Sequence, residues 1–81
     1  MKNILISNID KIHTTTMGID RIKKNLKLDN IDVVDFCKNK ITSDNSNIYK
    51  IGKNYYCEID NIKITINSSS YTIITAHYIG E

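Results

Sequence analysis

The sequence contains no proline and no tryptophan, and its 81 residues include only three glycines and two cysteines. The glycines, Gly18, Gly52 and Gly80, are scattered, so the chain has no glycine-rich loop that could cradle a phosphate. Cys37 and Cys57 stand apart, without the CxxC or histidine spacing of a zinc site. We therefore predict two reduced, buried thiols, no metal site and no cofactor.

Long apolar runs are also missing: none approaches the ~20 residues that a membrane-spanning helix needs. Asparagine, serine and aspartate interrupt the apolar residues near the start, so we identify no signal peptide. These absences predict a cytoplasmic protein without membrane contact. At this length we expect one small domain over residues 1–81.

Charge is nearly balanced, with 11 basic and 9 acidic residues and a net charge of +2. This value is compatible with nucleic-acid binding but does not indicate it. Isoleucine, asparagine and lysine dominate the chain, which is typical of an AT-rich coding sequence. The number of lysines therefore has no functional meaning by itself, and only their positions do.

Apolar residues recur at helical spacing in the first half of the chain, residues 1–41. Three threonines at positions 14–16 favour a helix N-terminus. Aspartates near the start of the last helix and lysines near its end suit the helix dipole. The pattern predicts helices over residues 3–12, 15–26 and 29–41. The last of these carries an apolar stripe of Ile31, Val34, Cys37 and Ile41.

The second half, residues 47–79, changes to the alternating pattern of strands. Short turns at 52–54, 60–61 and 68–69 separate the apolar runs, and tight turns imply antiparallel neighbours. We predict strands over residues 48–51, 55–60, 62–67 and about 71–79. The fold class is α+β: three N-terminal helices packed on one face of a four-stranded antiparallel β-meander.

Alternation also assigns side chains to faces of the sheet. Ile62, Ile64 and Ile66 are assigned to the helix-covered face, which places Lys63, Thr65 and Asn67 on the other, open face. In the last strand, we assign Ile74 and Ala76 to the core. The residues assigned there to the open face are Tyr71, Ile73, Thr75 and His77.

Histidines, cations and hydroxyls on an open face are the parts of a metal-independent ribonuclease. His77 is the candidate base or acid, with Lys53 and Arg21 as phosphate ligands. His13 has the same two interpretations as His77: a catalytic group, or a structural side chain beside a helix N-terminus. The candidate RNA contacts are Lys23, Lys24, Lys27, Lys63, Asn67 and Tyr71. The simpler alternative for the lysines is a solvated helix surface.

Three stretches resemble the motifs of an uncharacterised bacterial family, a small domain of unknown function. They are residues 12–26 (IHTTTMGIDRIKKNL), 52–56 (GKNYY) and 70–77 (SYTIITAH). This likeness covers nearly the whole chain but implies no activity.

Helices followed by a four-stranded meander, with a histidine after Thr-Ala near the end, are also similar to the barnase, colicin D and RelE-type ribonuclease fold. That resemblance implies a toxin that cuts tRNA or mRNA and is held by an immunity protein or antitoxin. It places Thr75 and His77 in the active-site position of the last strand, with Lys53 or Arg21 serving the phosphate. Unlike those enzymes, the chain shows no evident catalytic glutamate and no arginine cluster beyond Arg21.

The leading hypothesis is therefore a small ribonuclease of toxin type. One alternative is a winged-helix nucleic-acid binder, in which helices 15–26 and 29–41 form a helix-turn-helix and the hairpins form the wing. The acidic start of helix 29–41, which would be the recognition helix, argues against this alternative. Another alternative is a protein-binding inhibitor, such as a phage or mobile-element antagonist of a host system, that uses the sheet or its edge.

Overall fold

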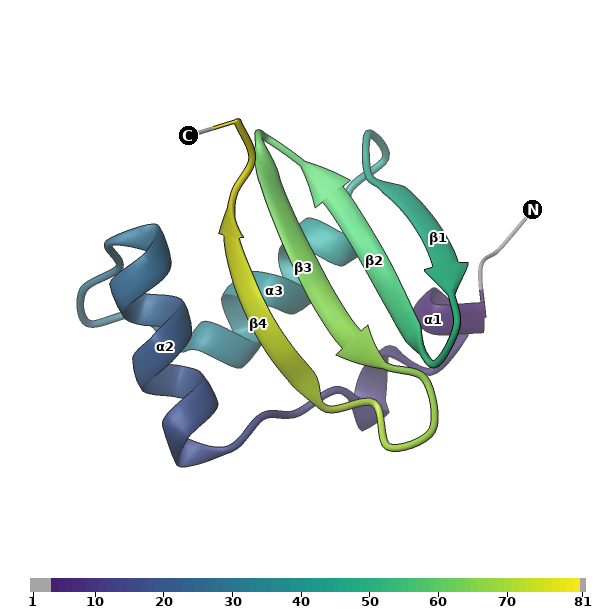
Figure 1. Cartoon of the computed structure of the whole chain (residues 1–81), viewed down its shortest axis with the longest axis horizontal. Helices are drawn as coiled ribbons and strands as arrows, with labels where there is room; N and C mark the ends of the chain where they lie inside the picture. Colours follow the sequence, from purple (N-terminus) through teal and green to yellow (C-terminus); the bar gives the residue numbers. More distant parts are fainter. Residues whose placement is uncertain (1–3, 81) are drawn as a thin grey trace.

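The computed structural model describes residues 4–80 and places short helices before a single sheet (Figure 1). The helical elements are α1 (Ile4–Ser7), the 3₁₀ turn η1 (Ile9–Lys11), α2 (Thr16–Leu26) and α3 (Val33–Ile41). The strands are β1 (Asn47–Ile51), β2 (Asn54–Ile59), β3 (Ile62–Asn67) and β4 (Ile73–Tyr78). They form one antiparallel sheet in the order β1-β2-β3-β4. The predicted α+β class and meander are confirmed.

α2 begins and ends as its sequence predicts. Thr15 caps the N-terminus, because its hydroxyl accepts a hydrogen bond from the Gly18 N–H at 3.0 Å. Gly18 itself is required, since a Cβ there would collide with the Thr14 hydroxyl. That hydroxyl is held in place because it donates to the Ile73 carbonyl at 2.8 Å. At the other end, Lys27 closes the helix in the left-handed conformation, with φ of 57°.

α3 begins later than predicted, at Val33 instead of residue 29. Asp32 is the cap, and its carboxylate accepts a hydrogen bond from the Asp35 N–H at 3.0 Å. Ile31 therefore precedes the helix and is 42% exposed, so its place in the predicted stripe is wrong. The buried stripe consists of Val33, Cys37 and Ile41.

The helix predicted over residues 3–12 is replaced by α1 and η1, and residue 3 lies outside the described residues. Asn8 separates the two pieces, with its side-chain amide donating to the Ile4 carbonyl at 2.9 Å. Such a local side-chain bond competes with continuation of the helix. Leu5 and Ile12 still reach the core, whereas Ile4 is exposed.

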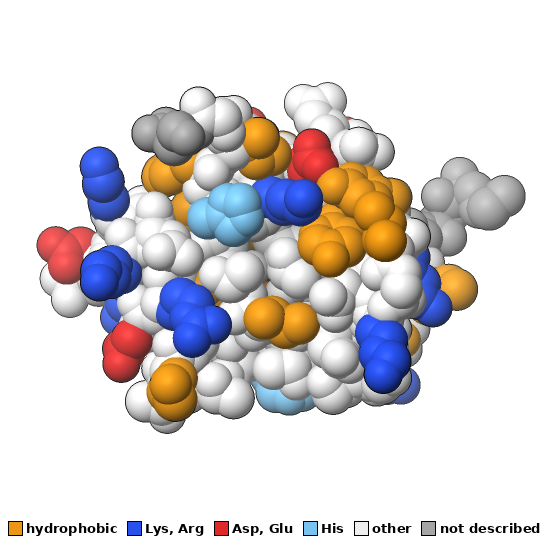
Figure 2. All heavy atoms as spheres, in the orientation of Figure 1, with side chains coloured by type: hydrophobic (Ala, Val, Ile, Leu, Met, Phe, Trp, Pro, Cys, Tyr) orange, Lys and Arg blue, Asp and Glu red, His pale blue; other side chains and the backbone are white. Residues whose placement is uncertain are grey.

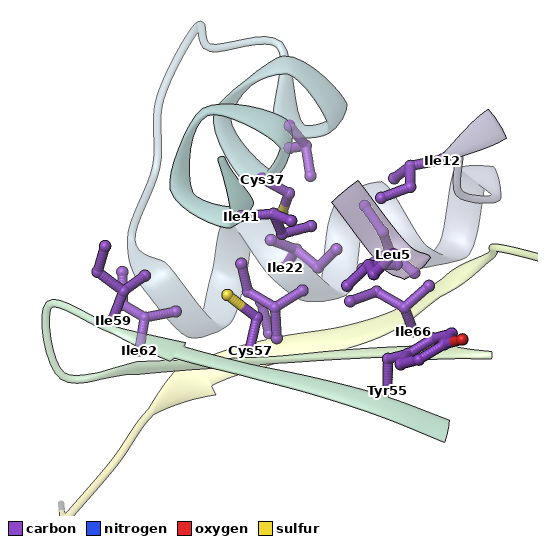
Figure 3. Close-up of a cluster of buried hydrophobic side chains, with 14 of the residues drawn as sticks. Leu5, Ile12, Ile22, Cys37, Ile41, Tyr55, Cys57, Ile59, Ile62 and Ile66 are labelled. Carbon is purple, nitrogen blue, oxygen red and sulfur yellow. The ribbon is translucent and has the colours of Figure 1, made fainter. Parts of the chain in front are cut away.

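The core is a single cluster to which α1, α2, α3 and the sheet all contribute. In Figure 3 the labelled side chains of helices and strands meet on one side of the sheet. The three isoleucines of β3 are between 0% and 4% exposed, which confirms their predicted burial. Figure 1 shows α3 behind the sheet and α2 alongside β4.

Cys37 and Cys57 lie inside this core as free thiols, as predicted. Burial raises the pKa of Cys37 to about 12 and that of Cys57 to about 11. Both side chains therefore stay protonated at neutral pH and act as small apolar groups.

A β-bulge near the start of β4 corrects the predicted faces of this strand. Thr75 lies opposite Thr65, but Ile73 lies opposite Ile66, so Ile74 is an extra residue in the ladder. As a result Ile73 is buried, at 1% exposure, and Ile74 is 38% exposed. The sequence-based prediction, which assigned Ile74 to the core and Ile73 to the open face, is therefore wrong for both residues.

The segment before α2 adds a short parallel bridge to β4. The His13 N–H donates to the Tyr71 carbonyl at 3.2 Å, and the Ile73 N–H donates to the His13 carbonyl at 2.7 Å. The His13 ring continues the connection: Nδ1 donates to the Lys11 carbonyl at 2.9 Å and Nε2 is 3.1 Å from the Thr72 hydroxyl. His13 thus ties the N-terminal segment to the start of β4.

Burial predicts that the loss of one methyl group lowers stability more at a core isoleucine than at an exposed isoleucine. Ile64→Val should lower the free energy of unfolding by about 0.5–1.5 kcal/mol, because Ile64 is fully buried on an inner strand. Ile51→Val is the matched control, since Ile51 is 63% exposed, and it should change stability by less than about 0.5 kcal/mol. Urea denaturation measures both, and equal effects would contradict this description of the core.

The bonding of His13 predicts that the two histidines differ in their effect on stability. His13→Ala removes both ring hydrogen bonds, which lie at the surface, and should cost about 0.5–1.5 kcal/mol. His77→Ala should cost less than about 0.5 kcal/mol, because its ring bonds only to the carbonyl of the next residue and connects no distant segment. Thermal and urea unfolding of the two variants provide the comparison, and a larger loss for His77→Ala would overturn the assignment.

Candidate functional site

A row of three chemically different side chains crosses the side of the sheet that faces away from the core. Glu58 of β2 lies opposite Lys63 of β3, and Lys63 lies opposite His77 of β4. Their neighbours Cys57 and Ala76 are fully buried, so alternation directs the row outward. We call these three residues the charged row, and this side of the sheet the open face.

Figure 2 shows the open face, because it keeps the orientation of Figure 1, in which α3 lies behind the sheet. A histidine lies beside a basic side chain on this face, with an acidic side chain and a hydrophobic patch next to them. Further basic side chains follow along the side where α2 runs.

His77 is exposed and oriented by its own backbone. Its Nδ1 donates a hydrogen bond to the Tyr78 carbonyl at 3.0 Å. Within residues 4–80, Nε2 has no hydrogen-bond partner. In the neutral ring, Nε2 therefore offers a lone pair, and in the protonated ring it offers a proton. This arrangement suits proton transfer with a bound molecule.

Two tyrosines hold the other end of the charged row. The Tyr49 hydroxyl donates a hydrogen bond to the Glu58 carboxylate, and this bond raises the pKa of Tyr49. The Tyr49 ring stacks on Tyr56, with 5.5 Å between centroids and 23° between planes. The Lys63 ammonium lies 4.9 Å from the centre of the Tyr56 ring. The Tyr49 hydroxyl thus orients Glu58, and the Tyr56 ring lies under the Lys63 ammonium.

Two open hollows lie along α2, and the first of them adjoins the charged row at His77. The first, of about 670 Å³, is lined by Asn25, Lys27, Asn61, His77 and Tyr78. The second, of about 560 Å³, is lined by Met17, Asp20, Arg21, Lys24 and Asn25. Asn25 lines both, and its side-chain amide donates to the Thr75 hydroxyl at 3.3 Å and the Ala76 carbonyl at 3.2 Å. The hollows therefore form a path from His77 along α2.

The five residues predicted to be catalytic do not converge. Thr75 and His77 share the open face, and Arg21 lies beside the second hollow. Lys53 lies in the turn before β2, five residues from Glu58, which places it roughly 15 Å from the charged row. His13 lies near the start of β4, with both ring nitrogens engaged. Lys53 and His13 are therefore removed from the candidate site.

The predicted RNA contacts divide in the same way. Lys63 and Lys27 flank His77, and Lys24 lines the second hollow. Asn67 instead holds the turn after β3, since its side-chain oxygen accepts hydrogen bonds from the N–H groups of residues 69 and 70. Tyr71 packs against the core, with the Lys11 ammonium 5.7 Å from its ring centre.

Lys23 is half-buried in the last turn of α2 and lines neither hollow. Asn67 and Tyr71 thus have structural roles, and Lys23 lies outside the candidate site.

Glu58 and Tyr56 are the site residues that sequence reasoning missed. The signal was present in the two-residue turn at 60–61, which pairs Ile59 with Ile62 and therefore Glu58 with Lys63. Asp60 and Asn61 both have positive φ, as such a turn requires. Strand register thus places a glutamate beside Lys63 on the open face.

Residues 4–80 contain no group of three or more His, Cys, Asp or Glu side chains that could hold a metal ion. No helix among these residues is long and apolar enough to cross a membrane.

Comparison with known proteins identifies a family but no activity. No curated protein and no solved structure matches the chain, so the likeness to the barnase, colicin D and RelE-type fold is not supported. A family model described as "Protein of unknown function (DUF3781)" matches residues 6–77. That range includes all of the motifs at 12–26, 52–56 and 70–77 on which the predicted family resemblance was based. The chain therefore belongs to the DUF3781 family.

Proposed function

We propose that the open face binds RNA and cleaves it through attack by the ribose 2′-hydroxyl. The observation that carries this proposal is the charged row, which aligns a carboxylate, an ammonium and an imidazole on adjacent strands. These groups match the requirements of the reaction: a base, a cation for the phosphorane and an acid. The helices cover the opposite face, which leaves this one accessible to a long polymer.

In this proposal each group of the charged row has one role. The Glu58 carboxylate takes the 2′-hydroxyl proton, and the 2′ oxygen forms a bond to phosphorus. Lys63 stabilises the phosphorane charge. The bond from phosphorus to the 5′ oxygen breaks as the His77 imidazolium gives its Nε2 proton to that oxygen. The products are a 2′,3′-cyclic phosphate and a 5′-hydroxyl end.

The geometry supports this assignment because attack and departure occur on opposite sides of phosphorus. Glu58 and His77 lie on opposite sides of Lys63, two strand spacings apart, or about 10 Å between backbones. The hydrogen bonds to Tyr49 and to the Tyr78 carbonyl fix the orientation of both groups before substrate binds.

The path of hollows along α2 would hold the flanking phosphates. Lys27, Lys24 and Arg21 provide the cations, and Asn25 and Asn61 provide amide groups. Lysines at the end of α2 also suit its helix dipole, so their position has a structural as well as a binding value.

A second candidate function is binding of a protein partner through the edge of β1. Within residues 4–80, β1 pairs only with β2, and Ile51 on this strand is 63% exposed. An added strand from a target protein would satisfy this edge. The same edge could also serve an antitoxin or immunity protein, in which case both functions hold.

The winged-helix alternative is less favoured, because Asp32 and Asp35 lie at the N-terminus of α3.

Substitutions in the charged row provide the test. His77→Ala and Glu58→Gln should each reduce RNA cleavage by about 10²- to 10⁴-fold, the usual loss for a general acid or base. Lys63→Ala should reduce it by about 10²- to 10³-fold through lost phosphorane stabilisation. Lys53→Ala is the matched lysine control and should leave the rate within about threefold of wild type, because Lys53 lies outside the site.

The measurement is cleavage of labelled tRNA and mRNA fragments in the presence of EDTA, with the product ends identified. Cyclic phosphate and 5′-hydroxyl ends are expected. If the wild-type protein, freed of any partner, leaves RNA intact across neutral pH, the catalytic proposal fails and the β1 edge becomes the leading site.

A further inference from the structure

A second row of side chains on the open face lies beside the charged row and has a stepped profile. It consists of Tyr49, Tyr56, Thr65 and Thr75, which are in register across the four strands. The large rings stand on β1 and β2, and the small hydroxyl side chains lie on β3 and β4. Thr65 is only 9% exposed, so it forms a low floor next to the Tyr56 ring.

The floor is bounded on its far side by α2. Asn25 approaches from this helix and donates a hydrogen bond to the Thr75 hydroxyl. In Figure 2, a white area with one small hydrophobic group at its centre separates the hydrophobic patch from the basic side chains alongside α2. Tyr56 and Thr75 are two strand spacings apart, about 10 Å, which is wide enough for a flat ring placed on edge.

The Tyr56 ring has an aromatic and a cationic neighbour. Tyr49 stacks on Tyr56, and the Lys63 ammonium lies over the Tyr56 ring at 4.9 Å from its centre. A lysine side chain is long and rotates easily, so Lys63 can turn from the ring to a phosphate. The exposed aromatic face would then accept a base, and every nucleobase has a π-face that stacks on tyrosine.

We infer that Tyr56, with Thr65 as floor, is a stacking subsite for one unpaired nucleobase next to the phosphate held by Lys63. The substrate class is therefore single-stranded RNA, since a paired base cannot leave its stack to enter the space without disrupting the duplex. This inference rests on the proposed function for the position of the phosphate. The stacking itself is measurable without cleavage.

Binding of uncleavable RNA tests the stacking subsite independently of the proposed cleavage. The probes are a fluorescein-labelled 2′-O-methyl single strand, the same strand with abasic sites, and the corresponding duplex, measured by anisotropy at low salt. Tyr56→Ala should weaken binding of the intact single strand by about 5- to 150-fold, the loss expected for one stacked base. Tyr56→Phe retains the ring and should bind within about threefold of wild type. Neither variant should change binding of the abasic strand or the duplex.

Each outcome has one meaning. Equal binding by wild type and Tyr56→Ala overturns the subsite, and so does an equal loss for intact and abasic strands, which would indicate a general effect on charge or folding. A selective loss without any RNA cleavage by wild type retains the subsite and rejects the catalytic proposal. Cleavage that depends on His77, with no selective loss in Tyr56→Ala, retains the catalytic proposal and rejects the subsite.

Discussion

Burial of the isoleucines of β3 is the interaction on which the rest of the structure depends. β3 is an inner strand, and Ile62, Ile64 and Ile66 all pack into the single core under the helices. Because strand side chains alternate, this burial directs Lys63 and Thr65 to the opposite face. Pairing with β4 then brings His77 next to Lys63. The candidate site is thus a geometric consequence of the core. A shift of β3 by one residue in its pairing register would disrupt the core and the candidate site together.

The bulge in β4 allows the core and the open face to coexist. A regular ladder would place either Ile73 or Ala76 on the wrong side of the sheet, because the two residues are three positions apart. The extra residue, Ile74, lets both enter the core while Thr75 and His77 still face outward. The cost is one partly exposed isoleucine, which lies on the same face as the proposed RNA site.

Local patterns in the sequence were sufficient for the class, the strands, the turns and the burial of both thiols. They failed where a single side chain or a long-range pairing decided the outcome. Asp32 rather than an earlier residue caps α3, Asn8 interrupts the first helix, and the bulge exchanges Ile73 and Ile74. For the site, alternation correctly placed Thr75 and His77 on the open face. The pairing register of β2 and β3 was needed to show that Glu58 lies beside Lys63 and that Lys53 lies far from both.

Two-dimensional ¹H–¹⁵N NMR of the protein, titrated with a 2′-O-methyl single strand, tests most directly whether RNA occupies the open face. The account predicts saturable shifts of the backbone amides of Glu58, Lys63 and His77, with those of His13 and Lys53 unchanged. Shifts confined to the edge of β1 or to the outer side of α3, or no shifts at low salt, would contradict it.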